Sequence, residues 1–414
     1  MSKKTNPNYR WVILIINFLA CAMAYAGLTI WSMASGDLAT TFNISSIQAS
    51  LGSGLFMAGY AVGSFVMAYL APKIGFRPCG VIGLGLMVIG TFIIPVSPSY
   101  ALILLARFMQ GWGILWLVGV NSSIAWFPAR QMGLASGVVG GGLTLGIGIG
   151  GWVATALINA TGSWQAAFKT WAIILLVFTV IWGVLFREPS KDMYPEDAKP
   201  AAEAGKAKAV NPYKTVAGWL CIIVMFLDCW QLIGFNSIMT GYLQERGYSA
   251  AQAATALLVA GLIGIAATPI GGIISDGLVK KGMIPLKARA YTQGILGFLI
   301  AAISTFIFPF LAPVSYGAAI LGSLLCGWGV PVVNATSGAI PVDLLNDPEA
   351  GGKLFGGTIL IGIGLGGILV PSIAVAVAEA AGWNAAFAVL AIGALVGTII
   401  SVALPKIRIA QEAD

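Results

Sequence analysis

The stretch Gly146-Ile-Gly-Ile-Gly-Gly151 lies inside a long apolar run and returns 216 residues later as Gly362-Ile-Gly-Leu-Gly-Gly367. Three more pairs of segments match in the same order along the chain: Asn43-Ile-Ser-Ser-Ile-Gln-Ala with Gly247-Tyr-Ser-Ala-Ala-Gln-Ala, Gly111-Trp-Gly113 with Gly327-Trp-Gly329, and Trp164-Gln-Ala-Ala-Phe168 with Trp383-Asn-Ala-Ala-Phe387. One such match could be a coincidence, but four in the same order indicate a duplication. The sequence therefore predicts two similar halves, in which the glycine runs are surfaces for close helix packing.

The composition is typical of a membrane protein. Of 414 residues, 58% are hydrophobic and 9% are charged, and the mean hydropathy is +0.91. Soluble globular proteins carry about 25% charged residues, so the composition argues against a water-soluble enzyme, a nucleic-acid-binding protein and a disordered chain. A spanning helix needs about 20 apolar residues, which leaves room for about a dozen helices and little else.

Twelve apolar runs, separated by turn or charge signals, are predicted to span the membrane. They cover residues 11–35, 47–70, 79–97, 100–126, 133–158, 165–186, 215–243, 251–275, 287–311, 315–341, 354–379 and 383–404. We therefore expect an all-α integral membrane protein with two pseudo-symmetric six-helix bundles. The N-terminal bundle covers 1–186, a cytoplasmic linker loop covers 187–213, and the C-terminal bundle covers 214–414.

The distribution of lysine and arginine predicts the orientation. Nineteen of them lie in the loops on the side of both termini and the linker, and the opposite loops hold only Arg246. Because cytoplasmic loops carry the excess of positive charge, both termini are expected in the cytoplasm, and the apolar run after the basic N-terminus is expected to be a retained first span in the inner membrane. The loop 342–353 is atypical, since it carries Asp343, Asp347 and Glu349 against Lys353.

Two loops suggest a gate. The loop after the second span reads Ala68-Tyr-Leu-Ala-Pro72-Lys73-Ile-Gly75-Phe-Arg77, and its counterpart in the second half contains Gly272-Ile-Ile-Ser-Asp276. These resemble the G-x-x-x-D-(K/R)-x-G-x-(K/R) motif of the major facilitator superfamily, with Ala68 and Pro72 replacing the Gly and Asp. The resemblance extends over essentially the whole chain and implies twelve helices, alternating access and a cytoplasmic charge latch formed by Lys73, Arg77 and Asp276. The alternative is that the cations only set the orientation.

Arg107 begins the segment Arg107-Phe-Met-Gln-Gly111 in the fourth span, which resembles the superfamily's R-x-x-x-G motif. A cation at this depth is costly unless it is paired or meets water. One interpretation makes Arg107 a partner for the substrate or for a coupling carboxylate. The other pairs it with Asp37 at the outer end of the first span, where it would hold two helices together.

Asp228 is the one acidic residue near the membrane midplane, in Phe226-Leu-Asp228-Cys-Trp230-Gln231. Histidine is absent, so proton chemistry near neutral pH must use carboxylates. A low-dielectric site disfavours the ionised carboxylate, which suits a group that is loaded and unloaded with protons during transport. The alternative is a neutral or paired aspartate that only fixes helix packing.

The fifth and eighth spans favour uptake. Drug exporters of the superfamily carry G-P-x-x-G-G in the fifth span, and this chain has Ile147 where the proline belongs. The segments Trp126-Phe-Pro128, Gly133-Leu-Ala-Ser-Gly137 and Thr268-Pro-Ile-Gly-Gly-Ile-Ile-Ser-Asp276 are similar to bacterial uptake carriers of the oxalate/formate antiporter or monocarboxylate type. The resemblance places their substrate-binding arginine at Thr268 and their lysine at about Thr358, and both positions are neutral here.

Aromatic and amide side chains are expected to line a central cavity, which the resemblance places between spans 1, 4, 7 and 10. Aromatic rings suit the apolar face of a solute and amides suit its polar groups. Each residue has packing as its alternative role. Together with Thr268 and Thr358, the predicted set is Tyr25, Arg107, Trp112, Trp116, Asn121, Trp230, Gln231, Asn236, Trp328 and Asn334.

The sequence thus predicts a secondary transporter, with proton-coupled uptake of a small organic solute, either an organic anion or a partly apolar metabolite. Asp228 is the predicted proton carrier. An uncoupled facilitator or exchanger and, with less support, an exporter remain as alternatives. The five cysteines show no CxxC spacing and no phosphate-binding loop is present, so no enzyme activity, cofactor, metal or nucleic-acid partner is expected. The expected partners are the substrate, protons and the lipid bilayer, and the chain is expected to be a monomer.

Overall fold

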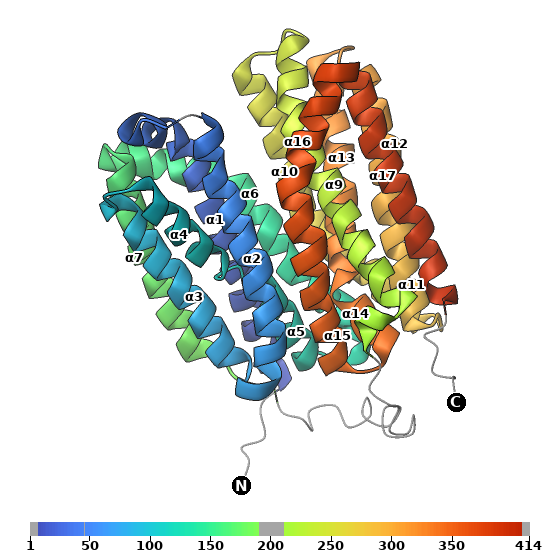
Figure 1. Cartoon of the computed structure of the whole chain (residues 1–414). Helices are drawn as coiled ribbons and strands as arrows, with labels where there is room; N and C mark the ends of the chain where they lie inside the picture. The colour runs from blue at the N-terminus through green and yellow to red at the C-terminus, as the bar shows by residue number, and fades with distance from the viewer. Residues whose placement is uncertain (1–6, 45, 190–210, 408–414) are drawn as a thin grey trace. The chain divides into compact units, whose positions relative to one another are not determined.

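The computed structural model describes residues 7–44, 46–189 and 211–407. Every regular element in these ranges is helical (Figure 1). The first half contains α1 (Arg10–Phe42), α2 (Ser46–Ile74), α3 (Phe76–Ile93), α4 (Tyr100–Gly111), α5 (Trp116–Trp126), α6 (Met132–Thr161) and α7 (Trp164–Leu185). Short 3-10 turns lie at η1 (Pro7–Tyr9), η2 (Ile94–Val96) and η3 (Ala129–Gln131).

The second half repeats this order with more interruptions. It contains α9 (Val216–Glu245), α10 (Ala250–Lys280), α11 (Pro285–Tyr291), α12 (Ile300–Leu311), α13 (Tyr316–Ser337), α14 (Ala339–Leu345), α15 (Pro348–Gly357), α16 (Gly364–Ala381) and α17 (Trp383–Ala403). Two π-helical segments, η5 (Thr292–Leu299) and η6 (Thr358–Ile363), join α11 to α12 and α15 to α16. Short 3-10 turns lie at η4 (Pro212–Lys214) and η7 (Leu404–Lys406).

The predicted membrane fold is confirmed. In the described ranges, 11 helical segments are long and apolar enough to cross a membrane. The fifth predicted span coincides with α6, where the apolar stretch is the shorter Met132–Ile147. Each predicted span therefore coincides with one helix or with a run of consecutive helical segments, and the ends differ by up to seven residues.

The described helices group into two compact units. One is built from residues within Met1–Trp126 and Gly142–Met193, and the other from residues within Phe127–Gly141 and Tyr194–Asp414. In the prediction, the linker separates the two bundles. The observed second unit includes Phe127–Gly141 as well, and therefore the start of α6. Most of the predicted linker lies outside the described residues.

Serine residues start several helices. Ser99, Ser163, Ser249 and Ser315 each accept a hydrogen bond from the backbone N–H three residues later, at the starts of α4, α7, α10 and α13. A serine at this position satisfies one of the N–H groups that a helix start leaves free, which stabilises the helix by about 1 kcal/mol. The four serines thus mark where these four helices begin.

The repeated glycines make the same contacts in both units. A Cβ on Gly111 would lie 2.1 Å from the Phe56 carbonyl oxygen of α2, and one on Gly327 would lie 2.1 Å from the Ala260 carbonyl oxygen of α10. In the second repeated run, Gly146 packs against α1 and Gly362 packs against α9. Equivalent helices therefore meet backbone to backbone in each half, as the duplication predicts.

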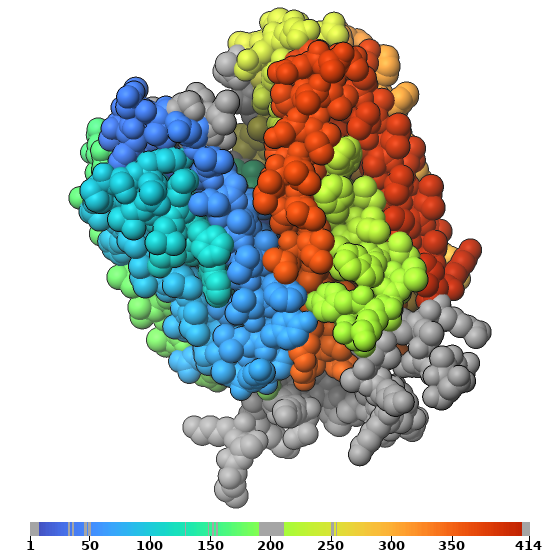
Figure 2. All heavy atoms as spheres, viewed as in Figure 1, coloured from blue at the N-terminus to red at the C-terminus, as the bar shows by residue number. Residues whose placement is uncertain are grey.

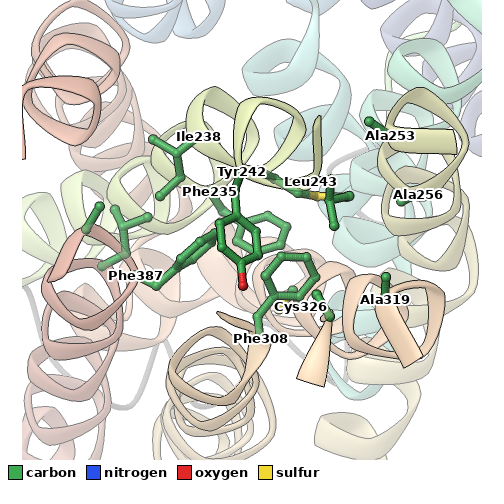
Figure 3. Packing of buried hydrophobic residues seen from close by; sticks show 14 of the residues in the cluster. Phe235, Ile238, Tyr242, Leu243, Ala253, Ala256, Phe308, Ala319, Cys326 and Phe387 are labelled. Atoms are coloured by element: carbon green, nitrogen blue, oxygen red, sulfur yellow. The ribbon is translucent and has the colours of Figure 1, made fainter. Parts of the chain in front are cut away.

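Aromatic side chains form a core in the second unit (Figure 3). The rings of Phe235 and Phe308 lie 5.2 Å apart, and those of Tyr242 and Phe387 also lie 5.2 Å apart. The Tyr242 hydroxyl donates to the Pro309 carbonyl oxygen at 2.6 Å. These contacts tie α9 to α12 and α17, so that the helix carrying Asp228 is held from its outer end.

One side of α9 reaches the surface of the second unit. On the face seen in Figure 2, the first turns of α9 lie between α16 and α17. The side chains exposed there are apolar, and they include Val216, Trp219 and Ile223. Apolar exposure of this kind suits contact with lipid, so the polar residues of α9 belong to its other sides.

Candidate functional site

Arg107 is completely buried in the first unit. Its Nε donates to the Gly52 carbonyl oxygen at 3.1 Å, and its Nη1 donates to the Gln110 side chain at 2.6 Å. The guanidinium carbon lies 4.7 Å from the ring centre of Trp31 and 4.5 Å from that of Phe56. The side chain is therefore positioned by α2, α4 and two aromatic rings, which attract the cation.

No carboxylate balances this charge. Among the described residues, Arg107 forms no ion pair, and its Nη2 has no hydrogen-bond partner. The predicted alternative, a pair with Asp37, is wrong, because Asp37 lies exposed at the outer end of α1 while Arg107 turns toward Gly52. A buried cation without a counter-ion is costly, so this site has an unsatisfied preference for an anion.

The other predicted residues of the first unit lie on α1, α5 and the turn between α4 and α5. Tyr25 and Trp116 are buried, whereas Trp112 and Asn121 are half-buried. Trp112 packs its ring against α2, where a Cβ on Gly63 would lie 2.9 Å from it. Packing on α2 thus positions Trp112, and its predicted contact with a substrate remains untested.

Sequence reasoning missed a buried polar network in this unit. Asn17 donates to Ser122, Ser123 and the Gly119 carbonyl oxygen at 3.0–3.2 Å, and its Oδ1 accepts from the Trp182 indole at 3.2 Å. Because these groups satisfy one another, the network explains how α1, α5 and α7 are held together.

Asp228 is 3% exposed on α9. Its Oδ1 has no hydrogen-bond partner among the described residues, and no cation pairs with it there. Its chain neighbour Cys229 faces η6, where the thiol lies 3.8 Å from the Ile363 carbonyl oxygen. An ionised carboxylate in this environment lacks both a counter-ion and a donor, so the side chain suits a group that carries a proton.

The remaining predicted residues of α9 point in different directions. Trp230 donates to the Val389 carbonyl oxygen of α17 at 3.3 Å. Gln231 donates through Nε2 to the Thr305 hydroxyl of α12, and its Oε1 has no partner in the described ranges. Asn236 is half-buried. The tryptophan and the glutamine therefore make contacts inside the second unit.

Trp328 and Asn334 lie on α13, Trp328 half-buried and Asn334 7% exposed. The Asn334 Oδ1 has no hydrogen-bond partner in the part of the chain that is described. It thus joins the side-chain oxygens of Asp228 and Gln231 among the buried acceptors of this unit that have no donor in the described ranges.

Thr268 and Thr358 are buried and satisfied by backbone. The Thr268 hydroxyl donates to the Gly264 carbonyl oxygen at 2.8 Å, and the Thr358 hydroxyl donates to the Phe355 carbonyl oxygen at 2.7 Å. The second unit therefore offers neutral hydroxyls at the two positions where the resembled carriers have cations.

Asp276 ties the end of α10 to the start of α6. Its two oxygens accept from the backbone N–H groups of Gly133 at 3.2 Å and of Leu134 at 2.8 Å. A helix start attracts negative charge, and here the carboxylate satisfies two free N–H groups as well. The predicted gating residue of the second half therefore has a geometry suited to a latch.

The sequence did not predict the ion-pair network beside Asp276. The Arg289 guanidinium lies 3.9 Å from the Asp276 carboxylate and forms a shorter ion pair with Asp343. Arg289 is 1% exposed, so the two carboxylates balance a buried cation. Asp343 belongs to the loop 342–353 that the sequence marks as atypical for its acids, but the sequence pattern did not indicate Arg289 as its partner.

The other acids of that loop also have local roles. Asp347 accepts from the backbone N–H groups of Glu349 and Ala350 at the start of α15, at 2.8 and 3.3 Å. Glu349 pairs with Lys353 one turn later at 2.5 Å. The acids of residues 342–353 thus contribute to a helix start and to ion pairs, and the orientation stays a prediction.

In the first half, Glu188 contacts the loop in which Pro72 replaces the aspartate of the motif. Its Oε1 accepts from the Arg77 backbone N–H at 2.7 Å, and Arg77 Nε donates to the Gly183 carbonyl oxygen at 2.7 Å. Gly75 has a φ of +93°, and a Cβ there would lie 2.7 Å from the same Glu188 oxygen. The start of the linker is therefore bound to this loop, while Lys73 is exposed.

Comparisons with known proteins agree with the fold. The family described as Major Facilitator Superfamily matches residues 13–292. The chain is 25% identical to the probable sulfoacetate transporter SauU of Cupriavidus necator, over 87% of this chain and 86% of that protein. It is also 25% identical to the probable galactarate/D-glucarate transporter GarP of Escherichia coli, over 72% of this chain and 74% of that protein. The crystal structure of the E. coli fucose:proton symporter FucP is similar, with a TM-score of 0.69 at 17% identity, and the match covers 95% of this chain and 98% of that chain.

Proposed function

Because this chain belongs to the major facilitator superfamily, a family of secondary transporters rather than enzymes, we propose that it takes up a small organic anion together with protons. Two similar bundles suit alternating access, in which the substrate site opens first to one side of the membrane and then to the other. In this proposal the protein lies in an inner membrane with both termini in the cytoplasm.

The names of two relatives support an anionic substrate. Sulfoacetate carries a sulfonate and a carboxylate, and galactarate and glucarate each carry two carboxylates. Such a solute needs positive charge in its site, since the transfer of a bare anion out of water is costly. Arg107 supplies that charge, because its buried guanidinium has an unpartnered Nη2 and no carboxylate beside it. The more specific resemblance to oxalate/formate or monocarboxylate carriers remains a prediction.

The proposal of proton coupling rests on Asp228. It is buried on α9, and its Oδ1 has neither a donor nor a cation among the described residues. Protonation removes the negative charge of the carboxylate and supplies a hydrogen-bond donor. The protonated side chain is therefore compatible with the membrane interior. Release of that proton to the cytoplasm then completes each cycle of uptake.

Asp276 is the proposed gate residue of the second half. Its hydrogen bonds to Gly133 and Leu134 hold the start of α6 against α10. Alternating access requires the cytoplasmic ends of helices to separate, so these two bonds form and break in the cycle. The exposed Lys73 and the Arg77–Glu188 contact are the proposed counterpart in the first half.

The experiment is uptake into liposomes that contain the purified protein, under an imposed inward proton gradient. The panel holds sulfoacetate, glucarate, a monocarboxylate, an amino acid and a neutral aromatic solute. We expect accumulation of at least one of the organic anions above its external concentration, and collapse of this accumulation by a protonophore. Equilibration without accumulation indicates an uncoupled facilitator or exchanger, and transport of neutral solutes alone contradicts the anion proposal.

A further inference from the structure

A small cavity lies inside the second unit, on the cytoplasmic side of Asp228. It has a volume of about 10 Å³, which is enough to hold one water molecule. Its walls come from α9, α13 and α14, from both π-helical segments and from η7, and the polar side chains in them are Gln293, Ser337 and Thr358. Each of these three side chains is at most 5% exposed.

The π-helical segments explain why the cavity exists. Gln293 lies in η5 and Thr358 begins η6. A π-helical turn holds one residue more than an α-helical turn, so it widens the helix and shifts the side chains that follow, and such turns are frequent at functional sites. Both segments therefore direct a polar side chain into the bundle at the same level.

The three side chains have enough free hydrogen-bonding groups to bind one water molecule. The Ser337 hydroxyl donates to the Asn334 carbonyl oxygen at 3.0 Å, and the Thr358 hydroxyl donates to that of Phe355 at 2.7 Å, so both hydroxyl oxygens can still accept. The Gln293 Oε1 accepts from Ser401 at 3.2 Å, and its Nε2 has no partner in the described ranges. One donor and two acceptors match the three or so bonds of a buried water.

The same face of α9 leads from the cavity to Asp228. Cys221 and Met225 line the cavity, and Asp228 follows Met225 by three residues, one turn further from the cytoplasm. Residues at this spacing share a helix face, and three residues rise about 4.5 Å along the axis. Asp228 is therefore the next residue on this face of α9 beyond the cavity wall.

We propose that a water molecule in this cavity relays protons between Asp228 and the cytoplasm, through the inside of the second unit. The Asp228 O–H bond breaks as its proton passes to the water oxygen, and the water passes another proton on toward the cytoplasmic end. The water is unchanged, and the carboxylate is left ionised for the next cycle. The proposal rests on the proposed role of Asp228 as proton carrier.

Apolar side chains also line the cavity. Ile340 and Leu404 belong to its wall and to an apolar cluster with Leu344 and Leu354. In the proposed relay these side chains separate before a proton passes beyond the water, so that the route does not conduct protons continuously.

The first test is X-ray hydroxyl-radical footprinting of the full-length protein in lipid nanodiscs. Radiolysis of an ordered water oxidises the sulfur side chains beside it, and Met225 lines the cavity at 2% exposure. Met239 is the matched control, because it lies on the same helix at 0% exposure inside the apolar core. We expect Met225 to be oxidised several-fold faster than Met239. Equal rates overturn the proposal.

The second test is Ser337→Ala, which removes one acceptor for the water. Ser323→Ala is the matched control, since Ser323 is buried on the same helix and also donates to a backbone oxygen, at 2.8 Å, but does not line the cavity. We expect Ser337→Ala to lower Met225 oxidation and to slow proton-driven uptake several-fold, with anion counterflow unchanged. An equal loss of counterflow overturns the relay and assigns Ser337 to the anion site.

The two tests separate this inference from the proposed function. Counterflow exchanges one anion for another and needs no net release of protons, so it reports the anion site alone. If the wild-type protein shows no proton-driven uptake, the proposed function fails, whereas Met225 oxidation still decides whether the cavity holds water.

Discussion

At the scale of residues, the buried charges divide into two kinds. Arg289 lies between Asp276 and Asp343, so its charge is balanced where it stands. Arg107 and Asp228 are as deeply buried, but neither has an ion partner in the described part of the chain. Perturbed and unbalanced charges gather at functional sites, so we propose transport roles for Arg107 and Asp228 and a structural role for Arg289.

We predict that Arg107→Gln weakens anion uptake and that Arg107→Lys restores it only in part. Loss of a charge-assisted contact costs about 1.5–3 kcal/mol, roughly a 10- to 100-fold rise in KM. Lysine keeps the charge but lacks the planar group that bonds Gly52 and Gln110 together. The measurement is uptake kinetics in liposomes for variants with wild-type elution in size-exclusion chromatography.

Lys169→Gln is the control for this prediction, because Lys169 is an exposed cation in the same unit. Its loss should leave KM unchanged. An Arg107→Gln variant that folds and transports with the wild-type KM would show that Arg107 only stabilises the helices around it.

The sequence predicted which residue types carry charge in the membrane, but not their partners. The interpretation of Arg107 with Asp37 failed because a backbone oxygen, Gly52, and a glutamine one turn away compete for the same guanidinium. The relay residues Gln293 and Ser337 were also missed. Their role depends on how three helices meet, and a pattern within one helix does not contain that information.

At the scale of elements, glycine contacts decide how closely helices approach. A Cβ on Gly366 would lie 2.5 Å from the Cys229 Cβ of α9. We predict that Gly366→Ala destabilises the protein by about 1–3 kcal/mol, because the helices must separate to admit the methyl group. Thermal unfolding in detergent, followed by tryptophan fluorescence, measures the change.

Gly85→Ala provides the comparison, because a Cβ at Gly85 meets no atom within 4 Å. Alanine has the higher helix propensity by about 1 kcal/mol, so this variant should unfold at the same temperature or a higher one. A Gly366→Ala protein as stable as Gly85→Ala would contradict the close packing of α16 on α9.

Most helices could be predicted because apolar runs and serine starts are local signals. The π-helical segments and the division of α13 from α14 could not. Residues 287–311 are predicted as a single span, yet the helix there changes from α to π at Thr292. That change depends on what the neighbouring helices leave room for, and tertiary packing overrides local propensity.

At the scale of the whole molecule, alternating access requires contacts that are made in one state and lost in another. Asp276 is suited to this role, because within the described residues its carboxylate binds only the backbone N–H groups of Gly133 and Leu134 and the Arg289 guanidinium. Such bonds can form and break without any change in packing inside α10. In the proposed gating role of Asp276, the helices therefore keep their internal structure.

We predict that Asp276→Asn loosens the start of α6. An asparagine accepts through one oxygen only, so one of the two N–H groups of Gly133 and Leu134 loses its partner. The loss of a charged acceptor costs about 1.5–3 kcal/mol, which should speed amide hydrogen exchange in residues 127–141 by roughly tenfold or more. Glu349→Gln, which removes an exposed acid, should leave that exchange unchanged, and equal exchange in both variants would contradict the latch.

The central claim is that an organic anion enters together with protons carried by Asp228. The most direct test is the internal pH of liposomes that contain the protein, with glucarate or sulfoacetate added outside and no gradient imposed. We predict that the interior becomes more acidic in the wild type, and that this acidification is faster at lower external pH. We predict no acidification in Asp228→Asn, although that variant still performs anion counterflow. Anion entry without any change of internal pH in the wild type, or equal acidification in Asp228→Asn, would contradict the claim.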